Sequence, residues 1–428
     1  MKSLLLAFAI PAVLFVSCSG NHKDAKTDAS NYDTIKTDSG ITIVKNKEGK
    51  VINTLPTSSL TGSGGTKSAT KDTSAKVQAA KEYPYYIGGV LIHGEGGNIT
   101  LDRLGIGNDI KPLIVQAANS EGRFGFDGAC SGPELMQLRL PAGNIQFIVR
   151  PKDTIDFTIV LEKPDDYKVY GSVESLQLEE VFNILNDANA KKSDIEDRIK
   201  ASQNNRQLYV RLMDKRVEQY KEINKEKRAT LMKFITKIDT SYVAILASLY
   251  LDPVEDFEFL KNLDNKLAGR YSKTVFYKSM HDKVATYAPV DIGKYAPEII
   301  SQTPEGKTVK LSSLRDKVVL LNFWVSYNPD SRNENPHFEK LYKKFKNKGF
   351  EILSYSVDKK KDQWTEAIRN DHMNWLNLSD LLGYQSAGSE TYVVNDVPFD
   401  FLIDRKGKIV AKNIYGKELD NKLNQLIK

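Results

Sequence analysis

The sequence contains very little cysteine or histidine, and this scarcity limits its chemistry. Cys18 and Cys130 are the two cysteines in 428 residues, which excludes both a disulfide scaffold and a zinc site with four cysteine ligands. The five histidines are scattered along the chain and form no ligand cluster. We therefore expect neither a metal nor a cofactor.

No block of the sequence is rich enough in one sign of charge to indicate a nucleic-acid surface. Lys and Arg number 61 against 55 Asp and Glu, which leaves a net charge of +6. The 40% hydrophobic and 27% charged content is ordinary for globular proteins. We expect no nucleic-acid partner, and a length of 428 residues predicts about three domains.

Long hydrophobic runs are also missing, apart from one uncharged apolar stretch over residues 4–16. This stretch follows Lys2 and is shorter than the ~20 residues that span a bilayer as a helix, so it predicts an export signal. It ends in Phe15-Val16-Ser17-Cys18, which resembles the lipobox of bacterial lipoproteins. The resemblance implies a signal peptide over residues 1–18, lipidation of Cys18 and a periplasmic or outer-membrane-surface location in the cell envelope. The alternative is an ordinary signal peptide cleaved nearby, with Cys18 lost.

Residues 19–81 are rich in Ser, Thr, Gly, Asp and Lys and poor in large apolar side chains. Such a composition does not bury enough surface to offset chain entropy, so it predicts a flexible tether. A short strand at 41–44 is possible, although we expect nothing nearby to pair with it.

Residues 82–171 are expected to form an antiparallel β sandwich or barrel, because short alternating or apolar runs are separated by turn residues. The predicted strands are 87–92, 99–104, 113–117, 123–126, 135–140, 145–149, 154–160 and 167–170. The turn at 121–126, the stretch 147–155 and the ending Val169-Tyr170-Gly171-Ser172 resemble a small β domain of unknown function. In Bacteroidetes lipoproteins that domain often precedes a thioredoxin-like domain. Cys130 is expected to be a small buried or loop thiol.

Residues 172–288 are expected to form a helical region, because 172–252 contain neither Gly nor Pro. Twenty of the 45 residues from 186 to 230 are charged. Val210, Met213, Val217 and Tyr220 recur at spacings of three and four, which predicts one apolar stripe facing a partner. The region is either a helical spacer or a protein-docking surface.

Residues 289–428 alternate strands with helices, which is typical of a sheet covered by crossover helices. A hairpin is predicted from 298–302 and 307–311, then strands at 318–325, 350–357, 399–404 and 408–412, and helices at 331–348, 362–370 and 417–427. The whole chain is therefore expected to be a multidomain α+β protein.

The last region resembles the membrane-tethered thioredoxin-like oxidoreductases of the TlpA and ResA type, the redoxins. The resemblance rests on Ala296-Pro297, the strand ending in Asn322-Phe323-Trp324, Arg332 with Glu334 and Pro336, Val357-Asp358, and Val397-Pro398 followed by Phe401-Leu402-Ile403-Asp404. It implies a mixed sheet with helices on both faces and a cis Val397–Pro398 bond beside the active site.

The active site of that family is degenerate here. Family members read roughly Phe-Trp-Ala-Ser-Trp-Cys-Pro-Pro-Cys-Arg, whereas Asn328 and Ser331 occupy the two cysteine positions in this chain. Disulfide exchange requires a thiolate, which neither an amide nor a hydroxyl supplies. We therefore expect no catalytic residue, and we expect Asn328, Asp330 and Ser331 to cap a helix. A serine nucleophile at Ser331 would need a base, and His337 is expected to point elsewhere.

Three functions remain open. The first is a redox-inactive module that binds an envelope protein or peptide in a groove lined by Trp324, Tyr327, Pro329, Asp330, Val397 and Pro398. The second is an envelope thiol–disulfide oxidoreductase of cell redox homeostasis, which would use cysteines of a partner or Cys130. The third is an envelope structural component without a groove function. Oligomeric state is not predicted.

Overall fold

The computed structural model describes residues 32–36, 42–46, 51–54, 81–107 and 109–427. The described residues before Glu82 and those from Glu82 onward form two separate compact units. The predicted signal peptide and Cys18 lie outside the described residues. Each unit is treated by itself below.

The first unit contains an antiparallel three-stranded sheet inside the predicted tether. Its strands are β1 (Tyr32–Lys36), β2 (Thr42–Asn46) and β3 (Val51–Thr54), paired in the order β1-β2-β3. The possible strand at 41–44 is thus present, but the expectation that nothing nearby pairs with it is wrong. Short runs containing β-branched residues on either side supply its partners.

The second unit begins with eight strands that form two four-stranded sheets. The sheet orders are β11-β10-β4-β7 and β6-β5-β8-β9. One cluster of buried side chains fills the space between them, including Ile87, Phe126, Phe147 and Phe157. The strands are β4 (Tyr83–Ile92), β5 (Asn98–Leu104), β6 (Ile110–Ala117), β7 (Arg123–Cys130), β8 (Glu134–Leu140), β9 (Gly143–Val149), β10 (Thr154–Val160) and β11 (Lys163–Tyr170).

All eight predicted strands are present, but their pairing is not wholly antiparallel. β4 pairs with β7 antiparallel and with β10 parallel. The prediction of an antiparallel sheet is wrong at this pair. Consecutive turn-linked strands suggested antiparallel neighbours, whereas β4 and β10 are brought together from distant parts of the chain.

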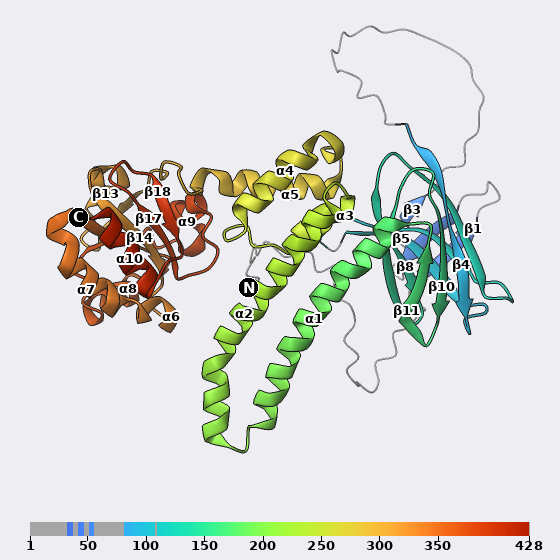
Figure 1. The fold of residues 1–428 in the computed structure, drawn as a ribbon, viewed down its shortest axis with the longest axis horizontal. Coiled ribbons are helices and arrows are strands. Elements are labelled where there is room, and N and C mark those ends of the chain that lie inside the picture. Colours follow the sequence, from blue (N-terminus) through green and yellow to red (C-terminus); the bar gives the residue numbers. More distant parts are fainter. Residues whose placement is uncertain (1–31, 37–41, 47–50, 55–80, 108, 428) are drawn as a thin grey trace, which may run out of the picture. The chain divides into compact units, whose positions relative to one another are not determined.

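Five helices follow, and the first packs against the sandwich (Figure 1). Leu104, Leu135 and Ile148 from the sheets share one hydrophobic core with helical residues such as Leu178 and Ile245. The β strands and the helices therefore stabilise each other. The helices are α1 (Val173–Ala201), α2 (Arg206–Ile238), α3 (Tyr242–Ser248), α4 (Phe257–Tyr271) and α5 (Val275–Tyr287), followed by the 3₁₀ turn η2 (Ala288–Val290).

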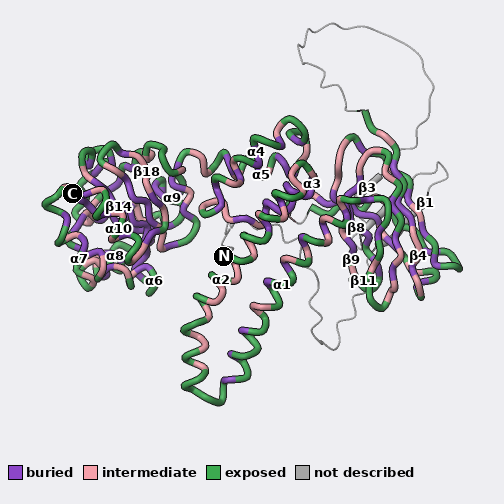
Figure 2. The backbone as a smooth tube through the Cα atoms, viewed as in Figure 1, coloured by how far each residue is buried: buried purple, intermediate pink, exposed green. Residues whose placement is uncertain are grey.

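α1 and α2 form a long antiparallel hairpin with little buried surface in its distal part (Figure 2). The predicted apolar stripe on α2 faces a partner only in part. Val210 and Val217 are 48% and 56% exposed, whereas Met213 and Tyr220 are half-buried and the Tyr220 hydroxyl donates to Glu196 of α1 at 2.5 Å. The residues of α2 buried in the core are Leu231 and Ile235, near its C-terminus. The spacing correctly predicted an amphipathic helix, but it wrongly placed Val210 and Val217 on the inner face of that helix.

A buried ion-pair network ties the sandwich to two helices. Arg150 donates to both carboxylate oxygens of Glu174 at 2.5 and 2.7 Å, and Ser241 Oγ and the Tyr242 backbone N–H donate to the same carboxylate at 2.8 and 2.7 Å. Burial opposes ionisation of Glu174, but these donors outweigh it and hold its pKa below the ordinary value. Glu174 is thus the point at which β9, α1 and α3 are joined.

The last part of the second unit is a five-stranded mixed sheet in the order β16-β15-β14-β17-β18. β14 (Val318–Trp324) and β15 (Phe350–Ser356) are buried along their whole length, as a continuous apolar pattern predicts. β14 pairs with β15 parallel and with β17 antiparallel. The remaining strands are β16 (Leu376–Leu378), β17 (Phe399–Ile403), β18 (Ile409–Lys412) and the hairpin β12 (Ile300–Gln302) and β13 (Thr308–Lys310).

Elements on both faces of this sheet contribute to two cores. One core contains Phe338, Trp364 and Leu419 from three helices, and the other contains Val309 from the hairpin and Tyr392. The predicted helix over 331–348 is divided at Glu334, which is followed by Pro336 in the first turn of the next helix. The elements are η3 (Leu311–Leu314), α6 (Pro329–Asn333), α7 (Asn335–Phe345), η4 (Lys346–Lys348), α8 (Lys361–Asn370), η5 (Gly383–Gln385), α9 (Ala387–Tyr392) and α10 (Gly416–Leu426).

Replacing the network carboxylate should destabilise the fold. Glu174→Ala leaves Arg150 half-buried without its counter-ion, and we expect the free energy of unfolding of residues 82–428 to fall by about 3 kcal/mol. Chemical denaturation measures this loss. The matched control is Glu180→Ala, an exposed acid of the same helix, which should change stability by less than about 0.5 kcal/mol. Equal losses in the two variants would contradict the role assigned to Glu174.

Candidate functional site

The loop that follows β14 is fixed by a buried carboxylate. Asp358 accepts hydrogen bonds from the backbone N–H of Ser326 at 3.0 Å and from its Oγ at 2.6 Å, and Ser356 Oγ donates to it at 2.7 Å. Asp358 is 1% exposed. It therefore holds the chain in place just before Asn328. Sequence analysis noted Asp358 within a motif but gave it no role.

Asn328 makes two contacts that define the site. Its Oδ1 accepts from the backbone N–H of Asp330 at 2.8 Å, which caps α6, and its Nδ2 donates to the carbonyl of Val397 at 3.1 Å. The capping prediction is confirmed for Asn328. The second contact joins the start of α6 to the residue before Pro398, and the Val397–Pro398 bond is cis as the resemblance implied.

Ser331 lies inside the domain. It is 1% exposed, and its Oγ has no hydrogen-bond partner among the described residues. His337 is turned away, because its Nε2 contacts Asp420 at 2.8 Å and its Nδ1 lies 3.6 Å from Glu334. Ser331 has no adjacent base in these residues, so the structure gives no support to a serine nucleophile.

Two exposed tyrosines, Tyr327 and Tyr384, lie near the same position, and Leu382 is exposed two residues before Tyr384. Tyr327 is 71% exposed, Leu382 54% and Tyr384 41%. The pKa of Tyr384 is raised to about 12, first by burial and then by Asp396 and Tyr327, which places these groups near each other. The sequence pattern did not identify Leu382 or Tyr384, which lie about 55 residues after Tyr327 in a segment without a motif.

The predicted groove residues divide into two sets. Tyr327, Pro329 and Asp330 are exposed and Pro398 is half-buried, so they form part of the surface. Trp324 is 0% and Val397 4% exposed, and both side chains belong to the hydrophobic cores. Trp324 and the Val397 side chain therefore support the surface from below and do not line it.

A second ion pair holds α6 and α7. Arg332 Nε donates to Asp371 at 2.8 Å, and Asn335 Nδ2 donates to the same carboxylate at 2.8 Å. The hydrogen bond to Asp371 raises the pKa of Arg332. Burial opposes ionisation of Asp371, yet Arg332 and Asn335 hold its pKa below the ordinary value. This pair fixes the helix that carries Ser331.

A carboxyl group without a partner lies on β17. Asp400 is 0% exposed, and neither of its oxygens has a hydrogen-bond partner among the described residues. Burial, with a smaller contribution from the charge of Glu334, raises the pKa of Asp400 well above the ordinary value. Burial also raises the pKa of Tyr415, with smaller contributions from Asp400 and Glu334. Sequence analysis missed Asp400, because a strand pattern does not show that its side chain faces the core.

Cys130 does not reach the surface. It is 0% exposed, free, and part of the core of the sandwich. Burial, followed by the charge of Glu134, raises the pKa of its thiol to about 12. A buried thiol that stays protonated is a poor nucleophile.

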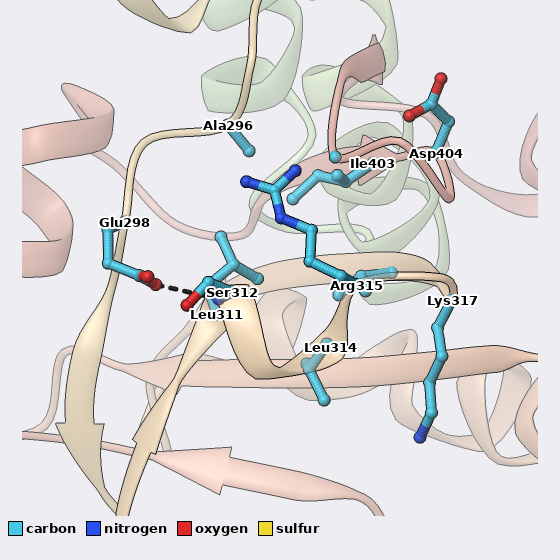
Figure 3. Close-up of a pocket in the computed structure, with 11 residues that line it drawn as sticks. Ala296, Glu298, Leu311, Ser312, Leu314, Arg315, Lys317, Ile403 and Asp404 are labelled. Atoms are coloured by element: carbon cyan, nitrogen blue, oxygen red, sulfur yellow. Dashed lines mark hydrogen bonds between the residues drawn. The ribbon is translucent and has the colours of Figure 1, made fainter.

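A small pocket lies elsewhere in the domain (Figure 3). It has a volume of about 100 Å³ and is lined by residues that include Glu298, Arg315, Lys317 and Asp404. These charged groups are already bonded within the chain: Glu298 accepts from the Ser312 N–H at 3.0 Å, and Arg315 donates to the Lys406 carbonyl at 2.8 Å. None of the predicted groove residues lines it.

Within the described parts of the chain, no three His, Cys, Asp or Glu side chains are grouped so as to hold a metal ion. None of the described helices is both long and apolar enough to cross a membrane.

Comparison with known proteins places residues 292–412 in a family model described as the AhpC/TSA family. The thiol-disulfide oxidoreductase ResA of Bacillus thuringiensis (strain Al Hakam) is 30% identical over 164 residues, which cover 38% of this chain and 89% of the relative. A ResA of Bacillus cereus is 32% identical over 157 residues, 37% of this chain and 86% of the relative. Among solved structures, the C-terminal domain of a putative thiol-disulfide oxidoreductase from Bacteroides thetaiotaomicron is similar, with 33% identity, 32% of this chain and 96% of that chain covered, and a TM-score of 0.31.

Substitution of the buried acid should stabilise the protein at neutral pH. Because the folded pKa of Asp400 is raised, the folded state holds its proton more tightly than the unfolded state, and stability is lost as the pH rises above about 4. Relative to Asp400→Asn, the native chain should lose about 1.4 kcal/mol per pH unit until the folded carboxyl ionises. Denaturation of residues 82–428 from pH 4 to 8 measures the difference.

The control for this titration is Asp362→Asn, a change at an exposed acid of the same domain, which should leave the pH profile unchanged. A constant stability difference between the Asp400→Asn variant and the native chain at every pH would show that Asp400 does not titrate as the geometry requires.

Proposed function

Because this chain belongs, through its C-terminal domain, to the thioredoxin-like family of the ResA thiol-disulfide oxidoreductases, we propose that the domain binds a protein or peptide segment without exchanging disulfides. The observation that carries this proposal is the chemistry of Asn328 and Ser331. An amide and a hydroxyl stand where the family pattern has its two cysteines.

The covalent step of disulfide exchange has no nucleophile in this domain. A thiolate attacks one sulfur of a substrate disulfide, forms a mixed disulfide and releases the other substrate sulfur as a thiolate. A second thiolate then attacks the sulfur of the first, closes a new disulfide and releases the remaining substrate sulfur as a thiolate. No cysteine occurs between residues 131 and 428. The Asn328 side chain is instead committed to the α6 cap and to the Val397 carbonyl, and Ser331 is buried. These contacts favour a structural role for both positions.

The surface beside Asn328 supports recognition by side chains more than by the backbone. Val397 accepts from Asn328 through its carbonyl, and its N–H donates to Asp396 Oδ1 at 2.9 Å. A peptide backbone would have to displace these bonds before it could pair with Val397. Exposed Tyr327, Leu382 and Tyr384 need no such displacement, and tyrosines of this kind often dominate binding energy. We therefore assign recognition to these three side chains.

We place the protein in the bacterial cell envelope, anchored by lipid on Cys18. The apolar run over residues 4–16 and the Ser17-Cys18 ending support this proposal. Metabolic labelling with a fatty acid, compared between the native chain and Cys18→Ser, tests it. Equal labelling of the two chains would refute lipidation at Cys18.

The alternative is an envelope thiol–disulfide oxidoreductase, which the ResA relatives favour at the level of the family. It would need cysteines from a partner or from Cys130. The burial of Cys130 and its raised pKa argue against the second route. An envelope structural component without a groove function is the third possibility, and it predicts no peptide binding.

Disulfide reduction separates the first two functions. Residues 82–428, one compact unit, should reduce insulin disulfides with dithiothreitol no faster than dithiothreitol alone, because they lack an accessible thiolate. The double variant Asn328→Cys with Ser331→Cys should be at least about tenfold faster, because it provides the attacking and the resolving thiol.

Asn328→Cys alone is the control, since it lacks a resolving thiol and should remain slow. Activity in the native chain would refute the redox-inactive function, and Cys130→Ser would then show whether Cys130 is responsible. If the double variant is also inert, the site has diverged from a thioredoxin groove and the peptide-binding proposal loses its main support.

Binding to an unfolded polypeptide separates the first function from the third. Reduced, carboxymethylated α-lactalbumin is the probe, because it is extended and has no free thiol. The variant Tyr327→Ala with Tyr384→Ala should bind it at least about tenfold more weakly than native residues 82–428 in fluorescence anisotropy. Tyr295→Ala is the control, because Tyr295 is 62% exposed but packs beside Arg315 and Lys408. No binding by the native chain, or equal loss in the control, would contradict the assigned surface.

A further inference from the structure

The distal end of the α1–α2 hairpin is an ordered surface that neither the core nor the groove uses. We define the hairpin tip as residues 198–213. The turn is closed by hydrogen bonds: Ser202 Oγ donates to the Ile199 carbonyl at 2.7 Å, the Asn205 N–H donates to the Ser202 carbonyl at 2.8 Å, and Asn205 Oδ1 accepts from the Leu208 N–H at 3.1 Å. These bonds fix the backbone of the turn between α1 and α2.

The charged residues of the tip are all cations, and Asp197 and Asp214 lie at its two borders. Arg198, Lys200, Arg206 and Arg211 are the charged residues between positions 198 and 213. Arg198 lies 3.8 Å from Asp194, whereas Lys200, Arg206 and Arg211 are exposed and make no ion pair with any described residue. These cations make the short segment strongly basic, whereas the whole chain of 428 residues has a net charge of +6.

Aliphatic side chains lie among these cations. Leu208 is 43% and Val210 48% exposed, in the first two turns of α2. Val210 lies between Arg206 and Arg211 in a shallow surface depression whose other lining residues are Gln207, Asp214 and Lys215. Exposed aliphatic side chains also occur elsewhere on α2, such as Val217 at 56%, so it is their combination with unpaired cations that distinguishes the tip.

Most of the distal hairpin has no part in the hydrophobic core. The core includes Leu178, Val181 and Leu185 of α1 and Leu231 and Ile235 of α2, all near the attached ends of the helices. Further out, Ile195 and Ile199 are buried but belong to none of the described clusters. The two helices extend ~40 Å or more, and the outer part serves only to carry the tip.

We propose that the hairpin tip docks on the surface of a lipid bilayer that contains anionic headgroups. Lys200, Arg206 and Arg211 would lie at the phosphate level, and Leu208 and Val210 would enter the boundary between headgroups and acyl chains. Charge complementarity identifies the partner as anionic. The two aliphatic side chains and the small area of a two-helix end favour a bilayer over an acidic protein, which needs about 800 Å² on each partner for a stable interface.

This inference goes beyond the proposed function and does not depend on it. Lipid on Cys18 would hold the chain near a membrane, and the tip would then be a second, weak contact of the kind that strengthens a lipid anchor. Peptide binding at Tyr327 and Tyr384 could fail without affecting the tip. The two proposals therefore fail separately.

Vesicle flotation with residues 82–428 tests the proposal, because this part of the sequence lacks Cys18 and residues 4–16. The native protein should float with vesicles of phosphatidylcholine and phosphatidylglycerol in a 3:1 ratio, and not with phosphatidylcholine alone. Lys200→Gln with Arg206→Gln should weaken binding at least about 25-fold, because each lost charge reduces affinity about fivefold. Leu208→Ser with Val210→Ser should weaken it about tenfold.

The matched control is Lys221→Gln with Lys225→Gln, which removes two exposed charges from the same helix outside the tip. This variant should bind vesicles like the native chain. Absence of binding by the native protein, or equal loss in the control, would overturn the proposal. Binding to immobilised polyglutamate as tight as to the anionic vesicles, with the Leu208→Ser/Val210→Ser variant unaffected, would also overturn it and identify an acidic protein as the partner.

Discussion

The arrangement of the C-terminal domain depends on the contact between the Asn328 side chain and the Val397 carbonyl. The Nδ2 of Asn328 joins two loops that are 69 residues apart in the chain, and its Oδ1 caps α6. Asp358 fixes the preceding loop, and Arg332 with Asp371 fixes the following helices. The start of α6, the cis Val397–Pro398 bond and the exposed Tyr327 are thereby held together as one surface.

The same contact explains how such a fold can persist without its sulfur atoms. A thiol at position 328 would be a weak hydrogen-bond donor and acceptor, whereas an amide has both a strong donor and a strong acceptor. Asn328 uses each of them once. An amide therefore stabilises the loop at a position where the family pattern has a cysteine, and the function that we propose for this surface is binding. On the proposal above, affinity comes from the tyrosines around the site and not from its former nucleophile.

The fold was largely predictable from the sequence, and the failures have physical causes. Continuous apolar runs such as β14 and β15 are long and unambiguous, and so are the eight runs of the sandwich. The parallel pairing of β4 with β10 depends on long-range contacts that periodicity does not contain. The α2 stripe failed in part, because Val210 and Val217 have the spacing of a core face but lie on an arm with no core beside it. Trp324 was taken for a surface residue because its motif borders the site, although its side chain faces the core.

Site residues that belong to a sequence motif could be predicted, whereas site residues outside any motif could not. Asn328 and Ser331 follow from the short pattern after β14, and Pro398 from the Val-Pro pair, but Asp400 appears only when the sheet register is known. In that register Asp400 lies opposite Asn322, which is aligned with Ser354 on β15, and Ser354 with Asn377 on β16. These four residues form a buried polar row across the sheet, in the carboxyl-terminal half of the parallel strands β14 and β15. Asn322 Nδ2 and Trp375 Nε1 both donate to Ser354 Oγ, so the row is satisfied there, whereas Asp400 has no partner among the described residues. This buried carboxyl without a partner is therefore the group in the row whose protonation the fold must accommodate, because burial raises its pKa well above the ordinary value.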